Sequence, residues 1–166
     1  MVTHRPPPAA AQGARATIRS ARLADLDAIV QLDAQVFGVT RHAYFERRLT
    51  ALDHDVSPSH TVGLVAEEDG VIVGFVMGTL TSGEFGFSEA AVLMDSIAVH
   101  PRRQRRGIGR QLAEALVAAS GARDVYTLVN GTSWDMLKFF DAIHFSLAQA
   151  VLLHQAAGDR KGDSHE

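Results

Sequence analysis

A glycine-containing turn, Gln104–Gly109, joins an apolar run to a helical stretch, and it constrains the fold more than any other feature of the sequence. We predict that the apolar run, Ala91–Val99, is a buried strand and that Arg110–Ala119 is a helix. Backbone N–H groups at the start of a helix have no intrahelical partners, and the helix dipole adds positive potential there. A strand that turns through glycines into a helix therefore predicts a binding site for phosphate groups.

The length and composition of the chain predict one folded domain. It has 166 residues, of which 46% are hydrophobic, and this is enough for one substantial core. We expect a flexible arm over residues 1–14, the domain over residues 15–156 and a disordered tail over residues 157–166.

The residue content argues against several classes of function. The chain has no cysteine, which excludes disulfides, thiolate metal sites and a cysteine nucleophile and fits a reducing cytoplasm. Its eight histidines include no His-x-x-x-His pair, so we expect no metal site. No stretch approaches the roughly 18 apolar residues of a membrane span. The net charge of −3 argues against a nucleic-acid partner. We therefore expect a cytoplasmic protein with neither a membrane nor a nucleic-acid partner.

Apolar periodicity and turn residues predict the order of the elements. Strands are expected at 16–20, 61–67, 71–80, 91–99, 125–129 and 145–153, and helices at 23–37, 42–52, 110–119 and 134–142. Asp69-Gly70, between two strand-like runs, predicts a hairpin. The expected fold is an α/β (α+β) domain whose mixed, mostly antiparallel sheet has about six to seven strands and about four flanking helices.

Two other phosphate-binding folds do not fit this turn. A P-loop needs a lysine directly after its last glycine, and none follows Gly109. A dinucleotide-binding fold places its glycines in the first strand–helix unit, and here three strands precede the strand that enters the turn.

The predicted strand ends in Val99-His100-Pro101, continues into Gln104-x-x-Gly107-x-Gly109, and is followed by Leu112 and Leu116 on the helix. In these residues the sequence resembles the GNAT superfamily of acyl-CoA-dependent N-acyltransferases. The order of elements from about Thr17 to Leu153 is also similar to that family, and Ala91–Leu116 is the most specific part.

The resemblance implies where acetyl-CoA would bind. Its pyrophosphate would lie on backbone amides between Arg105 and Arg110, where a side chain at Gly107 or Gly109 would block close approach. The pantetheine arm would pair with the preceding strand, while the strand's side chains could instead belong to the core. The residues expected to bind the cofactor are Ile97, Ala98, Val99, Gln104, Arg105, Arg106, Gly107, Ile108, Gly109 and Arg110, together with Ser133 and Phe140.

Attack on a thioester requires a neutral amine, so a base is expected, either direct or through water. Asp95 is the candidate, since period-two alternation predicts that it shares a strand face with Ile97 and Val99. Alternatively, Asp95 hydrogen-bonds a neighbouring loop, or holds a cationic substrate without taking its proton. Glu84 and Glu89, in the preceding loop, could also attract the amine.

A later motif departs from the family pattern. Many members carry Asn-x-x-Ala-x-x-Leu-Tyr and then Gly-Phe, and the tyrosine serves as general acid to the leaving thiolate. The matching positions here are Ser133, Met136, Phe139, Phe140 and His144-Phe145. Phe140 has no proton to donate, although a thiol with a pKa of about 8.5 can leave as a thiolate. Ser133 could bind the cofactor or cap a helix. Tyr44 and Tyr126 are other possible acids.

The resemblance implies an N-acetyltransferase that moves an acetyl group from acetyl-CoA to a primary amine, by direct attack in a ternary complex. The acceptor would be a protein, a peptide or a small molecule. The alternative is a catalytically weak acyl-CoA-binding regulatory domain, because Phe140 stands where the family has its general-acid tyrosine and cannot donate a proton. A third hypothesis is nucleic-acid binding through the arginines near the turn. Homodimers are common in the family, and Phe85 and Phe87 could contact a partner or line the acceptor pocket.

Overall fold

The computed structural model describes residues 16–53, 61–81, 89–122 and 124–148. The chain forms two compact units, Met1–Leu128 and Val129–Glu166. The expected N-terminal arm and C-terminal tail, together with Glu84, Phe85 and Phe87, lie outside the described residues.

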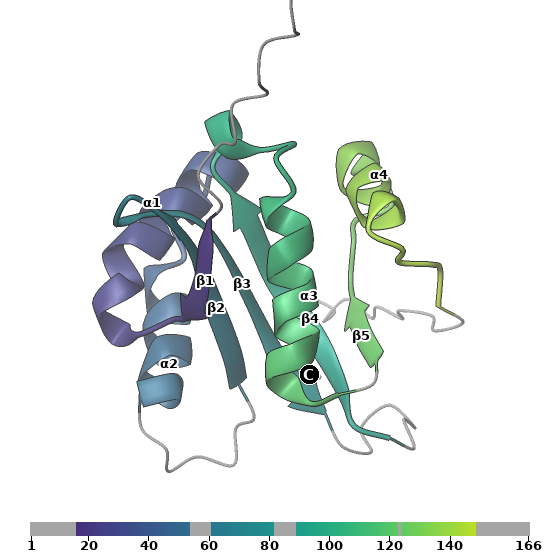
Figure 1. The fold of residues 1–166 in the computed structure, drawn as a ribbon, viewed down its shortest axis with the longest axis horizontal. Coiled ribbons are helices and arrows are strands. Elements are labelled where there is room, and N and C mark those ends of the chain that lie inside the picture. Colours follow the sequence, from purple (N-terminus) through teal and green to yellow (C-terminus); the bar gives the residue numbers. More distant parts are fainter. Residues whose placement is uncertain (1–15, 54–60, 82–88, 123, 149–166) are drawn as a thin grey trace, which may run out of the picture. The chain divides into compact units, whose positions relative to one another are not determined.

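The first unit contains a five-stranded sheet with its strands in sequence order (Figure 1). The strands are β1 (Thr17–Ser20), β2 (Thr61–Glu68), β3 (Val71–Thr81), β4 (Ala91–Val99) and β5 (Asp124–Thr127). The first four are antiparallel neighbours, and β5 runs parallel to β4. The hairpin between β2 and β3 turns at Asp69 and Gly70, whose φ angles of 50° and 78° are those that such a turn requires. The mixed, mostly antiparallel sheet is therefore confirmed.

The described residues contain five strands rather than the six to seven that the sequence predicts. The difference concerns the last candidate, Phe145–Leu153. Its described part, residues 145–148, is not a strand, and the rest lies outside the described residues.

Three longer helices belong to the first unit, and one belongs to the second. They are α1 (Leu26–Phe37), α2 (His42–Asp53), α3 (Ile108–Ser120) and, in the second unit, α4 (Trp134–Ala142). The helix predicted from Leu23 begins with a 3₁₀ turn, Leu23–Asp25, before α1. The four predicted helices are otherwise confirmed to within two residues at each end.

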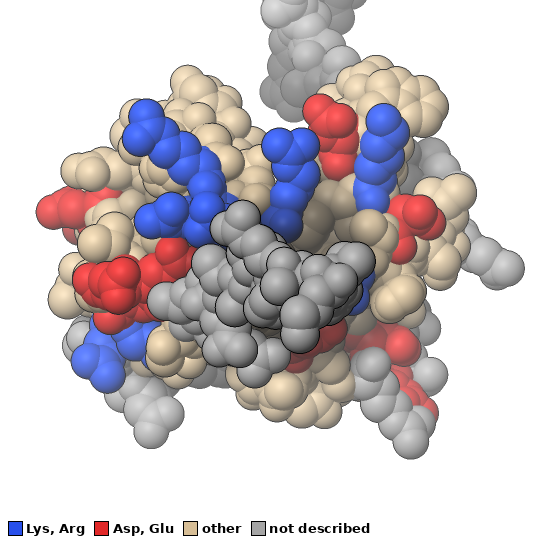
Figure 2. Space-filling view, turned by 45° about the horizontal axis from the view of Figure 1, so that its top comes forward, with Lys and Arg blue, Asp and Glu red and all other residues tan. Residues whose placement is uncertain are grey.

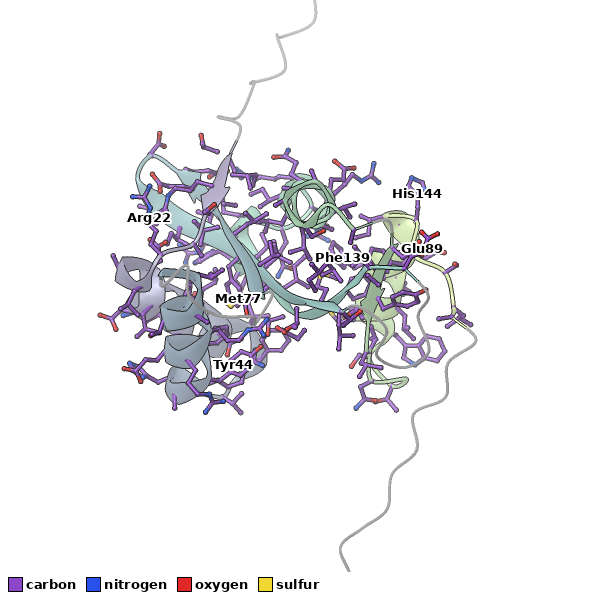
Figure 3. The ribbon with its side chains drawn as sticks, turned by 90° about the horizontal axis from the view of Figure 1, so that it is seen from below. Arg22, Tyr44, Met77, Glu89, Phe139 and His144 are labelled. Carbon is purple, nitrogen blue, oxygen red and sulfur yellow. The ribbon has the colours of Figure 1, made fainter. Side chains whose placement is uncertain are left out.

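The sheet has a separate helix layer on each face. Phe75, Met77 and Ala98 form one buried core with residues of α1 and α2. On the other face, a Cβ atom built on Gly74 or Gly78 would meet leucines of α3. Figure 3 shows the sheet between α3 and the α1–α2 pair. The face on which a strand residue lies therefore decides which helix it contacts.

Candidate active site

A β-bulge in β4 places Asp95. On β3 the consecutive residues Met77 and Gly78 pair with Ser96 and Met94, so Asp95 is an extra residue with no partner opposite it. Such an extra residue interrupts the alternation of side chains and re-aims them. As a result, Asp95 and Ser96 both face α2.

The bulge corrects the face that the sequence predicts for Asp95. Val99 pairs with Gly74, which faces α3, and Ala98 belongs to the core under α1 and α2. Ile97 lies between Ala98 and Ser96, so it shares the α3 face with Val99. Asp95 lies on the opposite face, and the predicted alignment with Ile97 and Val99 is wrong because a period-two pattern assumes a strand without a bulge.

Two side chains of α2 hold the Asp95 carboxylate. The Tyr44 hydroxyl donates to Oδ1 at 2.6 Å, and Arg48 Nη2 donates to Oδ2 at 2.7 Å. Burial raises the pKa of Tyr44, and its hydrogen bond to Asp95 raises it further, so the phenol keeps its proton at neutral pH. Figure 3 shows Tyr44 on the side of the sheet opposite α3. Asp95 nevertheless keeps 28% of its side-chain surface exposed, so an amine can reach it.

A second ion pair, between Asp33 and Arg41, lies next to the Asp95–Arg48 pair. Asp33 on α1 is fully buried, and Arg41, just before α2, binds both of its oxygens at 2.9 and 2.5 Å. The Asp33 carboxylate is the main cause of a raised pKa at Arg41. The same guanidinium lies over the Tyr44 ring, 5.2 Å from its centroid, and reaches Ser96 Oγ at 3.4 Å. Asp33, Arg41, Tyr44, Arg48 and Asp95 are called the bulge cluster below.

Part of β4 beyond the bulge has an open edge. The parallel pairing with β5 joins Ala91–Met94 to Asp124–Thr127 and goes no further. Within the described part of the first unit, Asp95–Val99 therefore has a strand partner only on its β3 side. An extended ligand could add to this edge as another strand would.

The turn after β4 leads into an uncapped helix start. The N-cap of α3 is Gly107, with φ 82° and no side-chain cap, and Arg105 also has a positive φ of 61°. The first helical hydrogen bond of α3 joins the Gln111 amide to the Gly107 carbonyl at 3.0 Å. The amides of Ile108 and Gly109 precede that bond, so they have no carbonyl partner within the helix. These amides and the helix dipole favour an anion.

The turn is tied to the sheet at two points. Gln104 Nε2 donates to the Val99 carbonyl at 3.0 Å, and Arg103 Nε forms an ion pair with Glu68 at 2.8 Å. Gln104 thus holds the turn, and its contact with the cofactor stays a prediction. Arg105, Arg106 and Arg110 are exposed. In a view onto this end of the molecule, basic and acidic side chains are interspersed (Figure 2).

Ser133 and Phe140 belong to the second unit. Ser133 is the N-cap residue of α4, but its side chain makes no capping hydrogen bond. Phe140 is buried, and its ring lies 5.0 Å from each of the rings of Phe139 and Phe145. His144 has φ 70°, a backbone conformation that glycine adopts readily, so it acts as a turn residue.

The described residues contain neither a cluster of metal ligands nor a helix that could span a membrane. No group of three or more acidic or histidine side chains among these residues is placed to hold a metal ion. None of the helices there combines the length and the apolar character needed to cross a bilayer.

Comparison with known proteins identifies the family. The sequence profile described as the Acetyltransferase (GNAT) family matches residues 26–140, which is more than half of the chain. The chain belongs to this family. The protein is thus a GNAT acetyltransferase, as the residues around the turn predict.

Relatives of this GNAT protein differ in their acceptors. An N-alpha-acetyltransferase of Sulfurisphaera tokodaii is 27% identical over 162 residues, which is 90% of this chain and 92% of the relative. An aminoglycoside N-acetyltransferase solved with CoA has a TM-score of 0.73 at 19% identity, over 90% of this chain and 99% of that one. A ribosomal-protein-alanine N-acetyltransferase of Brucella melitensis has a TM-score of 0.65 at 21% identity, over 85% and 99%.

Reasoning from the sequence missed Asp33, Arg41 and Arg48 in this GNAT domain, and it named Tyr44 only as a possible acid. Arg41, just before α2, and Tyr44 and Arg48 within it are spaced three and four residues apart, so they lie on one side of the helix. That spacing was a usable signal. Their common target was not predictable, because no local pattern shows that this face meets the bulge in β4.

Proposed function

We propose that the protein transfers an acetyl group from acetyl-CoA to a primary amine, by direct attack in a ternary complex. One observation carries the proposal. A single chain segment presents an exposed carboxylate at the bulge, an open strand edge after it, and then an uncapped helix start. These parts match, in order, an amine, an extended amide-containing arm and a pyrophosphate.

The donor is proposed to follow the chain from β4 to α3. Its pyrophosphate would accept hydrogen bonds from the amides at Ile108 and Gly109, and exposed Arg105 and Arg106 would contribute positive charge. The pantetheine arm would pair with the backbone of Ile97–Val99. This extension brings the thioester towards Asp95, because the bulge directly precedes that part of the strand.

The acceptor is proposed to react at Asp95. The amine nitrogen attacks the thioester carbonyl, the C–S bond breaks, and CoA leaves as a thiolate. Asp95, directly or through a water molecule, takes the proton that the ammonium group loses before attack, and the second proton, released from the nitrogen as the amide forms, passes to solvent or to the thiolate. Phe140 has no proton to donate. We therefore expect the CoA thiolate to leave unprotonated or to take a proton from water. No covalent enzyme intermediate is required.

Two relatives support different parts of this proposal, one the transfer to an amine and the other the binding of CoA. The curated relative is an N-alpha-acetyltransferase and aligns along nearly the whole chain. A structural neighbour was solved with CoA. A protein or peptide amine and a small-molecule amine are both acceptors that the proposal allows.

Gly107 provides a test of the donor site that has a matched control. We expect Gly107→Ala to raise the dissociation constant of CoA at least about tenfold, because a strained N-cap displaces the amides that hold the pyrophosphate. Gly121→Ala, at the opposite end of α3, has a similar φ of 66° and open space around it. Both variants should lose about 1 kcal/mol of stability. Calorimetric titration with CoA should distinguish them, and equal affinity in the two variants would contradict the proposed site.

A second candidate function follows from Phe140. A regulatory domain that only binds acyl-CoA would need no proton donor to the thiolate, and Phe140 provides none. Such a domain would give the same binding result for Gly107→Ala. Steady release of CoA from acetyl-CoA in the presence of an amine distinguishes the two functions, since only the transferase shows it.

A further inference from the structure

Two guanidinium groups beside Asp95 bear on which amines can approach it. Arg48 contacts Asp95 directly, and the Asp95 charge contributes to the raised pKa of Arg41. The other carboxylate of the bulge cluster, Asp33, is fully buried and bound by Arg41. Within this cluster two positive charges therefore face two negative ones, and Asp95 is the carboxylate that an acceptor can reach.

Arg48 is held in one position. Its Nη1 donates to Thr79 Oγ1 and its Nη2 to Asp95 Oδ2, both at 2.7 Å. Its side chain is only 17% exposed, and its buried Nε has no partner among the described residues. Because both terminal nitrogens of the guanidinium are hydrogen-bonded, the group stays in place when a substrate arrives. Its positive charge is therefore a fixed part of the surroundings of Asp95.

This charge arrangement disfavours polycationic acceptors. The first ammonium group of a polyamine or an aminosugar can pair with Asp95. Further ammonium groups would then lie near Arg48 or Arg41, and like charges that are brought together oppose binding. A molecule with one ammonium group avoids this repulsion.

The region next to Arg41 suits a peptide. Arg41 is about one-third exposed, and it lies over the Phe37 ring at 5.6 Å from the centroid. Phe37, the last residue of α1, and Val39, in the connection to α2, have exposed apolar side chains. A guanidinium donates hydrogen bonds to carbonyl oxygens, and apolar residues contact apolar side chains. A peptide N-terminus supplies one ammonium group, a carbonyl beside it and side chains further on.

We propose that the acceptor is the α-amino group of a peptide or protein, and that Arg48 is a specificity-determining residue that excludes polycationic amines. This inference rests on the proposed acetyl transfer. The inference narrows the acceptor from primary amines in general to molecules that carry one ammonium group with a carbonyl group beside it.

The substrate test uses three acceptors with acetyl-CoA and the full chain. These are a lysine-free peptide with a free N-terminus, a peptide with a blocked N-terminus and one lysine, and spermidine. We expect kcat/KM to be at least about tenfold higher for the free N-terminus than for spermidine. Turnover with spermidine as the best acceptor would overturn the inference while leaving acetyl transfer intact. Absence of transfer to all three would instead count against the proposed function.

Variants of Arg48 give a readout that a purely structural role would not change. Arg48→Gln should shift the ratio of the two kcat/KM values at least about tenfold towards spermidine, because the fixed positive charge is removed. Arg48→Lys keeps the positive charge, so its ratio of kcat/KM values should stay within about threefold of that of the unmodified protein. Arg47→Gln, at the exposed neighbouring position on α2, is the matched control and should not change it. Equal losses for both acceptors in Arg48→Gln would overturn the specificity role.

Discussion

Replacing Asp95 with asparagine is expected to lower the rate of acetyl transfer by at least about 100-fold and to leave the affinity for CoA unchanged. General-base catalysis contributes about 10²–10⁴ in rate, and an amide cannot accept the proton of the attacking amine. The asparagine oxygen can still accept one of the hydrogen bonds that Tyr44 and Arg48 make to Asp95. The effect should therefore appear mainly in kcat. Steady-state kinetics, combined with CoA titration, measure both quantities.

The pH profile and a matched variant sharpen this test. With Asp95→Asn, the remaining rate should follow the fraction of neutral amine, which rises towards the pKa of about 7.7–8.0 of a peptide α-amino group. Asp27→Asn changes an exposed carboxylate on α1 and should have no effect. A rise in KM with unchanged kcat would show that Asp95 only holds the cation. An unchanged rate at all pH values would remove Asp95 from the mechanism.

Replacing Arg41 with methionine is expected to reduce the free energy of unfolding by about 3 kcal/mol. Removal of one member of a buried ion pair leaves the other charge uncompensated, at a cost of about 3–5 kcal/mol. Asp33 is fully buried, while Arg41 is partly exposed, so we expect the lower end of that range. Denaturant unfolding monitored by circular dichroism measures the change.

A double variant separates this cause from a loss of packing. Asp33→Leu combined with Arg41→Met removes both charges and should recover more than half of the lost stability. Arg47→Met should change stability by less than about 0.5 kcal/mol, because Arg47 is exposed. If Arg41→Met cost less than about 1 kcal/mol, the ion pair would not have the structural role assigned to it.

Much of the fold was predictable because it depends on local patterns. The Asp69-Gly70 hairpin, the extent of β4 and the glycine-rich start of α3 each follow from residues adjacent in sequence. The last strand candidate shows the limit of this approach. The apolar pattern over Phe145–Leu153 predicts a strand, whereas residues 145–148, the part of it that the structure describes, do not form one.

Only those parts of the candidate site that are formed by residues adjacent in sequence were predictable. The uncapped start of α3 could be anticipated from Gly107 and Gly109, whereas the positive φ of Arg105 could not, since arginine rarely adopts it. The surroundings of Asp95 depend on a one-residue shift between β3 and β4. That shift follows from how two strands pair, so the sequence of β4 alone does not reveal it.

Acetyl transfer itself is the central claim, and one measurement tests it most directly. The full chain is incubated with acetyl-CoA and a peptide that has a free N-terminus, and the acetylated peptide and free CoA are quantified together. We predict equal amounts of both products, formed at a rate proportional to protein concentration and lowered at least about 100-fold in Asp95→Asn. If CoA bound but neither this peptide nor any other amine became acetylated, the result would contradict the account and favour a domain that only binds acyl-CoA.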